Sequence, residues 1–109
     1  MRGKFYDQHY VPEMYRDSFY PGFLVDKVKS ALKKVVEYFN TCDYYDDEEI
    51  QDAFDAAISE INDLQREFDM NGSELETVAR DSIHATVGRI IEHFELDKDV
   101  DDATGQIAF

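Results

Sequence analysis

Three segments of the chain repeat apolar side chains every three or four residues, which is the period of an amphipathic α-helix and not of a strand. They are residues 23–40, 47–69 and 73–94. In the second segment the stripe is spaced 4-3-4-3-4 like a heptad seam, over Ile50, Phe54, Ala57, Ile61, Leu64 and Phe68. The stripes of the first and third segments are Leu24, Val28, Ala31, Leu32, Val35, Val36 and Phe39, and Val78, Ala79, Ile83, Val87, Ile90, Ile91 and Phe94. The pattern predicts an all-α protein with three long helices.

Turn and capping residues separate these segments. Pro21-Gly22 precedes the first helix, and Asn71-Gly72 ends the second, with Gly72 able to adopt a positive φ. Ser73 and Glu76 have the spacing of a capping box for the third helix. Because the connections are short, consecutive helices should be antiparallel neighbours. We therefore expect an up-down-up antiparallel bundle of three long helices, flanked by an N-terminal aromatic arm (residues 1–22) and a short C-terminal helix and tail (residues 97–109).

The aromatic arm contains six aromatic side chains in its 22 residues. We expect Tyr15, Phe19, Tyr20 and Phe23 to pack down on the bundle. The alternative is that some of these rings stay exposed as contact anchors, because tyrosine combines a rigid apolar ring with a polar tip.

Negative charge is concentrated in the middle of the chain. The formal net charge is −14. Residues 43–76 contain thirteen acidic side chains and a single basic one, Arg66, whereas residues 1–42 contain seven basic and five acidic side chains. Such a segment repels nucleic acid phosphates and anionic lipid surfaces and attracts cations or basic proteins. It also predicts that the lysine-rich edge of the first helix attracts the acidic second helix.

The length of 109 residues suits one domain that spans the whole chain, 1–109. The single cysteine, Cys42, excludes an intrachain disulfide. The chain has no apolar run long enough to cross a membrane, and its start has no apolar core of a signal peptide. We therefore expect a cytoplasmic protein that does not bind membranes, as a monomer or, through the heptad seam, a homodimer.

Few residue patterns in the chain suggest catalysis or metal binding. Residues 97–101 have the Asp-x-Asp-x-Asp start of a calcium loop, but Asp102 replaces the required glycine and Ala108 the required bidentate acid. Asp81-x-x-His84 is the only pair of its kind, whereas a di-iron bundle needs two such pairs and two more glutamates. The acidic neighbour Asp43 does not favour a reactive thiolate at Cys42. We expect no catalytic residue, no metal site and no cofactor.

Three stretches carry a family resemblance: residues 14–29, with the run Met-Tyr-Arg-Asp-Ser-Phe-Tyr-Pro, residues 61–68, and residues 73–81. They resemble a family of small acidic bacterial proteins catalogued as a domain of unknown function. The resemblance covers most of residues 14–94 and implies a bacterial, helical, cytoplasmic protein. It implies no catalytic or binding residue.

The connection at residues 41–46 and the acidic helix after it provide the best candidate for a functional surface. Two adjacent tyrosines cannot both point inward easily, and here they are surrounded by aspartates. Aromatic rings among carboxylates are typical of a surface that recognises a basic protein. The predicted partner-binding residues are Tyr44, Tyr45, Asp47, Glu48, Asp52, Asp55 and Asp63.

The function expected from this surface is a protein-protein interaction module that binds a basic partner, of the immunity, antitoxin or inhibitor type. The alternative is a small ligand-binding protein or enzyme whose site lies under the N-terminal aromatic arm.

Overall fold

The computed structural model describes residues 5–109, which form helices and connections without any β-strand. A 3₁₀ helix, η1 (Asp7–His9), is followed by six α-helices. They are α1 (Pro12–Arg16), α2 (Gly22–Thr41), α3 (Asp47–Asp63), α4 (Gln65–Met70), α5 (Thr77–His93) and α6 (Val100–Ala103). The all-α class and the three long helices, α2, α3 and α5, are confirmed.

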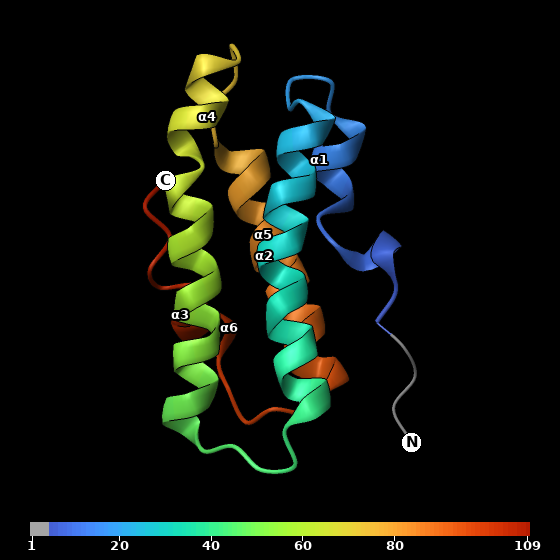
Figure 1. Ribbon diagram of the computed structural model, residues 1–109, viewed down its shortest axis with the longest axis vertical. Coiled ribbons are helices and arrows are strands. Elements are labelled where there is room, and N and C mark those ends of the chain that lie inside the picture. The colour runs from blue at the N-terminus through green and yellow to red at the C-terminus, as the bar shows by residue number, and fades with distance from the viewer. Residues whose placement is uncertain (1–4) are drawn as a thin grey trace.

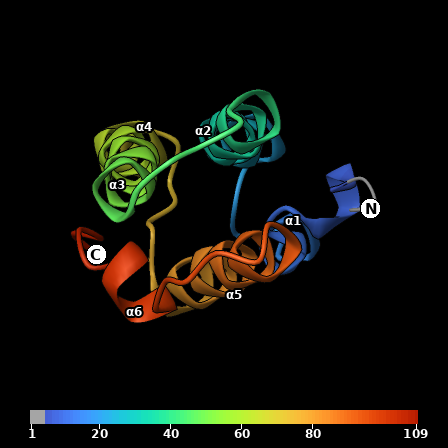
Figure 2. The same cartoon turned by 90° about the horizontal axis from the view of Figure 1, so that it is seen from below.

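The helices form two layers (Figures 1 and 2). The first layer is the antiparallel hairpin of α2 and α3, with α4 continuing α3 beyond a break at Leu64. The second layer contains α5, with α1 along one side of it and α6 along the other. Figure 2 shows α2 and α3 end-on but α5 lengthwise, so α5 lies obliquely across the hairpin. The simple up-down-up arrangement of three helices is therefore not confirmed.

The α2–α3 hairpin is held by apolar packing inside and by ion pairs outside. Lys27 Nζ lies 2.6 Å from Glu67 Oε1, and Lys34 Nζ lies 2.9 Å from Glu60 Oε1. The expected attraction between the lysine edge and the acidic helix is thus confirmed. Because these pairs are exposed, they contribute little to stability and mainly favour this register of α3 and α4 against α2.

The core between the layers is aromatic at its centre. The Phe39 ring of α2 lies 5.9 Å from the ring of Phe54 on α3 and 5.5 Å from that of Phe94, just after α5. All three rings are almost inaccessible to solvent. Val78, which the periodicity places in the core, is instead 43% exposed in the first turn of α5.

The start of α5 differs from the prediction. Gly72 has a φ of +74°, and the amides of Gly72 and Ser73 donate to the carbonyls of Asp69 and Phe68, as in a Schellman motif that ends α4. Ser73 therefore belongs to the end of α4, and α5 begins only at Thr77, with Glu76 as its N-cap and no side-chain cap. The predicted Ser73–Glu76 capping box is wrong. The Ser73 hydroxyl is buried and has no hydrogen-bond partner among the described residues.

A capping box does occur at the start of α3. The Asp46 carboxylate accepts a hydrogen bond from the Glu49 amide at 2.9 Å, and the Glu49 carboxylate accepts one from the Asp46 amide at 3.3 Å. Negative side chains at this N-terminus are further stabilised by the helix dipole.

Asp46 and Ser73 give opposite predictions for their substitution by alanine. Asp46→Ala should lower the free energy of unfolding by about 1 kcal/mol, because it removes a cap. Ser73→Ala should leave the free energy of unfolding unchanged or raise it by up to about 1 kcal/mol, because it removes a buried, unsatisfied hydroxyl. Urea denaturation followed by circular dichroism measures both. A loss of about 1 kcal/mol in Ser73→Ala would show that Ser73 acts as a cap after all.

The described part of the aromatic arm, residues 5–22, packs along α5. Val11 and Met14 have no solvent exposure, and the Val11 amide donates to Thr86 Oγ1 at 2.9 Å. Val11 has a φ of +37°, an unfavourable value for a β-branched residue, which the buried contacts of its side chain maintain. The buried Ser82 hydroxyl donates to Glu13 Oε1 at 2.6 Å. This hydrogen bond lowers the pKa of the Glu13 carboxyl below its ordinary value of 4.5.

The lowered pKa of Glu13 predicts a pH-dependent contribution to stability. The carboxylate stabilises the fold above the ordinary pKa, and that stabilisation is lost as the pH falls through the folded-state pKa. Glu13→Gln, which cannot ionise, should therefore be less stable than the unmodified protein at neutral pH, with a difference that shrinks between about pH 5 and about pH 3. Unfolding free energies of both proteins across this range test the prediction, and a difference that is independent of pH would contradict it.

Candidate protein-binding surface

The outer side of α3 carries three of the predicted acidic residues, two near its start and one at its end. Glu48, Asp52 and Asp63 are exposed, and the helical spacing puts them on one side of α3, away from the core residues Phe54 and Ile61. None of these three carboxylates makes an ion pair with another residue in the described part of the chain. Tyr44, just before α3, is 80% exposed, as predicted for a contact residue.

The other three predicted residues are engaged within the protein. The Tyr45 ring packs edge-on against Phe39, with ring centroids 4.9 Å apart. Asp47 Oδ1 lies 3.3 Å from the Nζ of Lys98, whose side chain is only 8% exposed. Asp55 is half-buried, and its Oδ1 accepts a hydrogen bond from Gln51 Nε2 at 2.8 Å. The same Gln51 amide donates to the Asp102 carbonyl, so Asp55 lies beside the C-terminal segment that covers this side of α3. The candidate surface is thus reduced to Tyr44, Glu48, Asp52 and Asp63, which we call the acidic face.

The lysines of the described chain are all paired with the protein's own carboxylates. Lys27 and Lys34 pair with α4 and α3, and Lys98 pairs with Asp47. Lys29 and Lys33 lie 3.3 and 3.5 Å from the carboxylate of Asp7. The hydrogen bond from Lys29, with the added charge of Lys33, lowers the pKa of the Asp7 carboxyl. The internal pairs use up the ammonium groups and leave the excess of carboxylates facing solvent.

An apolar groove lies between α2 and α3 beside the acidic face. Its volume is about 200 Å³, and it is lined by Ala31, Lys34, Val35, Tyr38, Ala53, Ala56, Ala57 and Glu60. This groove was not among the sites predicted from the sequence. The signal was present in the alanines at 53, 56 and 57 of α3, which follow its outer edge where larger side chains would fill the space.

Tyr38 closes one end of this groove. Its hydroxyl donates to Glu49 Oε2 at 3.2 Å. Partial burial, together with the neighbouring Cys42 thiol and the Glu49 carboxylate, raises the pKa of Tyr38 to about 12. Tyr38 therefore remains a neutral hydrogen-bond donor at physiological pH.

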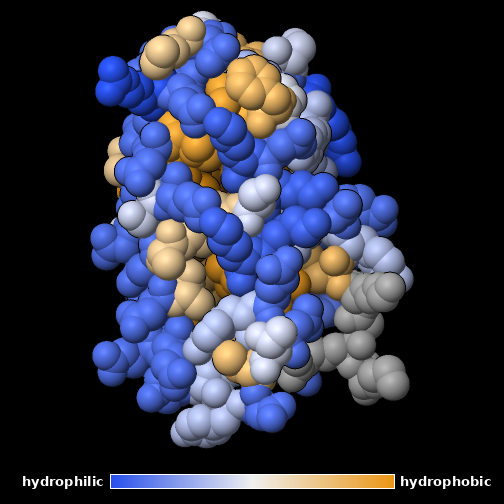
Figure 3. Space-filling view, viewed as in Figure 1, coloured by the Kyte–Doolittle hydropathy of each residue, from blue (hydrophilic) through white to orange (hydrophobic). Residues whose placement is uncertain are grey.

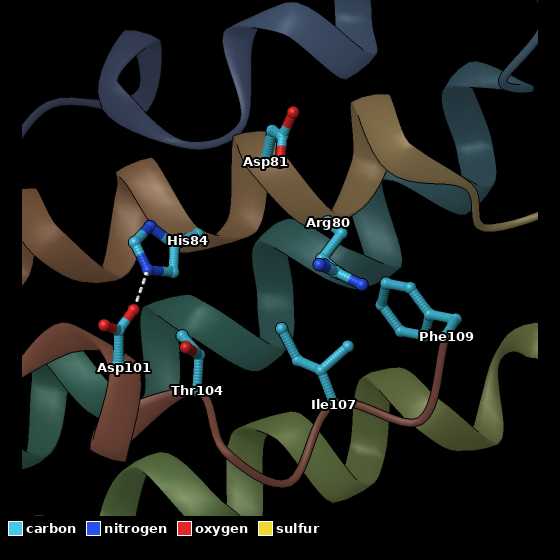
Figure 4. A pocket seen from close by; sticks show the side chains of 7 residues that line it. All are labelled: Arg80, Asp81, His84, Asp101, Thr104, Ile107 and Phe109. Atoms are coloured by element: carbon cyan, nitrogen blue, oxygen red, sulfur yellow. Dashed lines mark hydrogen bonds and ion pairs between the residues drawn. The ribbon is translucent and has the colours of Figure 1, made fainter.

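A second, more polar hollow of about 370 Å³ lies between α5 and the C-terminal segment (Figure 4). His84 of α5 points towards Asp101 of α6, with Nε2 and Oδ1 2.9 Å apart, whereas Asp81 points away from both. Asp99 accepts a hydrogen bond from the Asp101 amide and caps α6. His84, Asp99 and Asp101, from these two patterns, thus make contacts within the protein. No group of three or more potential metal ligands occurs within residues 5–109.

The aromatic arm is only partly packed. Tyr20 is buried against Phe68, with ring centroids 6.1 Å apart, but Tyr15 and Phe19 are each 42% exposed and Phe23 is 55% exposed. The prediction that all four rings pack down is therefore wrong for Tyr15, Phe19 and Phe23. Val11, Met14 and Tyr20 fill the interior on this side of the protein. A hollow of about 290 Å³ nevertheless lies between the start of the described arm and α5, lined by Phe5, His9, Arg89, Glu92 and His93.

The fold and its surface define a class: an all-α protein with an acidic, solvent-facing helix, whose described lysines pair with its own carboxylates. The chain belongs to a family of unknown function (DUF5713), whose model matches residues 4–107. No curated protein and no solved structure matches the chain. Among the described residues, no helix combines the length and the apolar character needed to cross a membrane.

The two adjacent tyrosines should respond differently to substitution. Tyr45→Ala should lower the free energy of unfolding by about 2 kcal/mol, because the ring packs against Phe39 in the core. Tyr44→Ala should change it by less than about 0.5 kcal/mol, because the side chain is at the surface. Thermal and urea denaturation of both variants check this, and equal losses would show that Tyr44 is also part of the core.

Proposed function

We propose that this protein is an interaction module that binds a basic protein partner through the acidic face of α3, as inhibitors, immunity proteins and antitoxins do. Its single cysteine, Cys42, is free, which suits a reducing compartment, and we place the interaction in the cytoplasm. The proposal assigns no catalytic residue, metal or cofactor to the chain.

The observation that carries the proposal is the internal pairing of every described lysine. A protein with a large negative charge ordinarily spreads its few cations among its acids, which keeps the protein soluble without creating a binding surface. Here each described lysine pairs with a carboxylate of the protein, while Glu48, Asp52 and Asp63 project from one side of α3 without any ion-pair partner in residues 5–109. A basic surface approaching this side meets carboxylates that do not have to break internal pairs.

Tyr44 gives this face an aromatic anchor at one end. Its ring is exposed in the connection before α3, where Asp43 and Asp46 flank it. Exposed tyrosines are enriched among the residues that contribute most to protein interfaces. Long-range attraction from the carboxylates would increase the association rate, and the ring would provide local apolar contact.

Charge reversal on this face tests the proposal. The triple variant Glu48→Lys, Asp52→Lys and Asp63→Lys should lose the capture of basic proteins from cell extract at about 0.05 M salt, since each substitution replaces attraction by repulsion. Binding by the unmodified protein should weaken as the salt rises to about 0.5 M. The measurement is affinity capture followed by identification of the bound proteins by mass spectrometry.

The matched control makes the same change of charge elsewhere. Glu74, Glu92 and Asp97 are exposed and make no ion pair within the described chain, so Glu74→Lys, Glu92→Lys and Asp97→Lys keep the net charge equal to that of the first variant. This control should retain the captured proteins. Equal loss in both variants would mean that overall charge and not the acidic face causes the binding, which would contradict the proposal.

A further inference from the structure

The outer side of the α2–α3 hairpin is open to solvent. The layer of α1, α5 and α6 covers only the opposite side of this hairpin, as Figure 2 shows. Figure 3 looks onto the open side, where apolar surface lies at the bottom of a depression between hydrophilic ridges. This depression includes the groove between α2 and α3 described above.

The floor of the groove is made of small apolar side chains from both helices. Ala31 and Val35 come from α2, and Ala53, Ala56 and Ala57 come from α3. Ala56 is exposed and Ala53 is partly exposed, so the groove is accessible from solvent. Small side chains on neighbouring helices leave room for the side chains of a third element to interdigitate.

The rims of the groove differ in charge. Lys34 on the α2 rim and Glu60 on the α3 rim form an ion pair between the two walls, with Nζ and Oε1 2.9 Å apart. On the α3 rim, Asp52 lies one turn before Ala56, and Asp63 lies one turn after Ser59. The carboxylates of Asp52 and Asp63 have no ion-pair partner in the described chain. The groove is therefore apolar at its floor and negative along one edge.

The chemistry of the groove selects a helical occupant. Its lining offers no row of backbone amides or carbonyls, because both walls are helices whose backbone groups are bonded internally. An extended peptide buried there would leave its own backbone groups without partners, whereas a helix satisfies them itself. Helix-in-groove recognition uses apolar residues at helical spacing on one face of the ligand, and the acidic edge adds a requirement for cationic residues beside them.

We propose that the groove between α2 and α3 binds an amphipathic, cationic helix of the partner protein. Its apolar face lies on Ala53, Ala56 and Val35, and its lysine or arginine side chains lie beside Asp52 and Asp63. This inference rests on the proposed function and specifies which part of the basic partner is recognised.

Two synthetic peptides of identical lysine and leucine composition test it on the full-length protein. In the first, the leucines recur at helical spacing and form one apolar face, and in the second the order is scrambled so that no such face exists. The amphipathic peptide should bind about tenfold more tightly than the scrambled one in fluorescence anisotropy titrations, because only the first can fill the groove. The methyl NMR signals of Ala53 and Ala56 should shift on binding.

A substitution that fills the groove can be made without changing the charge of the protein. Ala56→Gln should weaken binding of the amphipathic peptide about tenfold, because the longer side chain occupies the floor. Ala85→Gln is the matched control, since Ala85 is likewise an exposed alanine within a long helix, α5, outside the groove. It should leave the affinity unchanged, and circular dichroism should show that both variants remain folded.

The outcomes separate this inference from the proposed function. Equal affinity for the two peptides, no effect of Ala56→Gln, or NMR shifts confined to other helices would overturn the groove assignment. If the groove assignment fails in this way but the charge-reversed variant binds neither peptide, the acidic face remains the binding surface and the groove has no part in it. If neither peptide binds at about 0.05 M salt, both proposals are contradicted.

Discussion

The antiparallel packing of α2 against α3 is the contact on which the rest of the structure depends. It aligns the apolar stripes of two long helices, and it brings Phe39 and Phe54 together as a platform that Phe94 completes from the second layer. The same packing sets Lys27 and Lys34 opposite Glu67 and Glu60. It also creates the groove on the outer side, because small residues of both helices face each other there. Core, charge pairing and candidate binding surface are thus consequences of one helix-helix register.

The arrangement of the charged side chains matters more than the net charge of the protein. Cations on α2 and on Lys98 are used in contacts between elements, including the ion pairs that link the N-terminal segment to α2 through Asp7. Glu48, Asp52 and Asp63 on the solvent side of α3 are among the carboxylates that make no ion pair in the described chain, and others lie elsewhere on the surface. In water such exposed charges contribute little to folding stability, and their mutual repulsion opposes it slightly. Under the proposed function, the effect of these carboxylates is to attract a basic partner.

Local sequence patterns were reliable where a single helix decides the outcome. The bounds expected for the first helix, residues 23–40, differ by only one residue at each end from α2, and Asn71-Gly72 ends α4 with the positive φ that glycine allows. The patterns failed where two neighbouring elements compete for one residue. Ser73 has the spacing of an N-cap, but its amide completes the Schellman motif of α4, which directs its side chain inward and delays α5 until Thr77. Val78 fits the apolar stripe but is exposed in the first turn of α5, although the adjacent Ala79 is buried.

The candidate surface was predictable only in outline. The sequence by itself determined an all-α protein with three long helices and one strongly negative segment, because helical period and charge are local properties of the chain. Only the tertiary structure decided which of the predicted residues are free, because Lys98 and Phe39 reach Asp47 and Tyr45 from other elements, and Asp102 of the C-terminal segment bonds Gln51, the hydrogen-bond partner of Asp55. It also decided that α5 crosses the hairpin obliquely and leaves one side open, since the crossing angle depends on how side chains of separate helices interdigitate and not on the period within either helix.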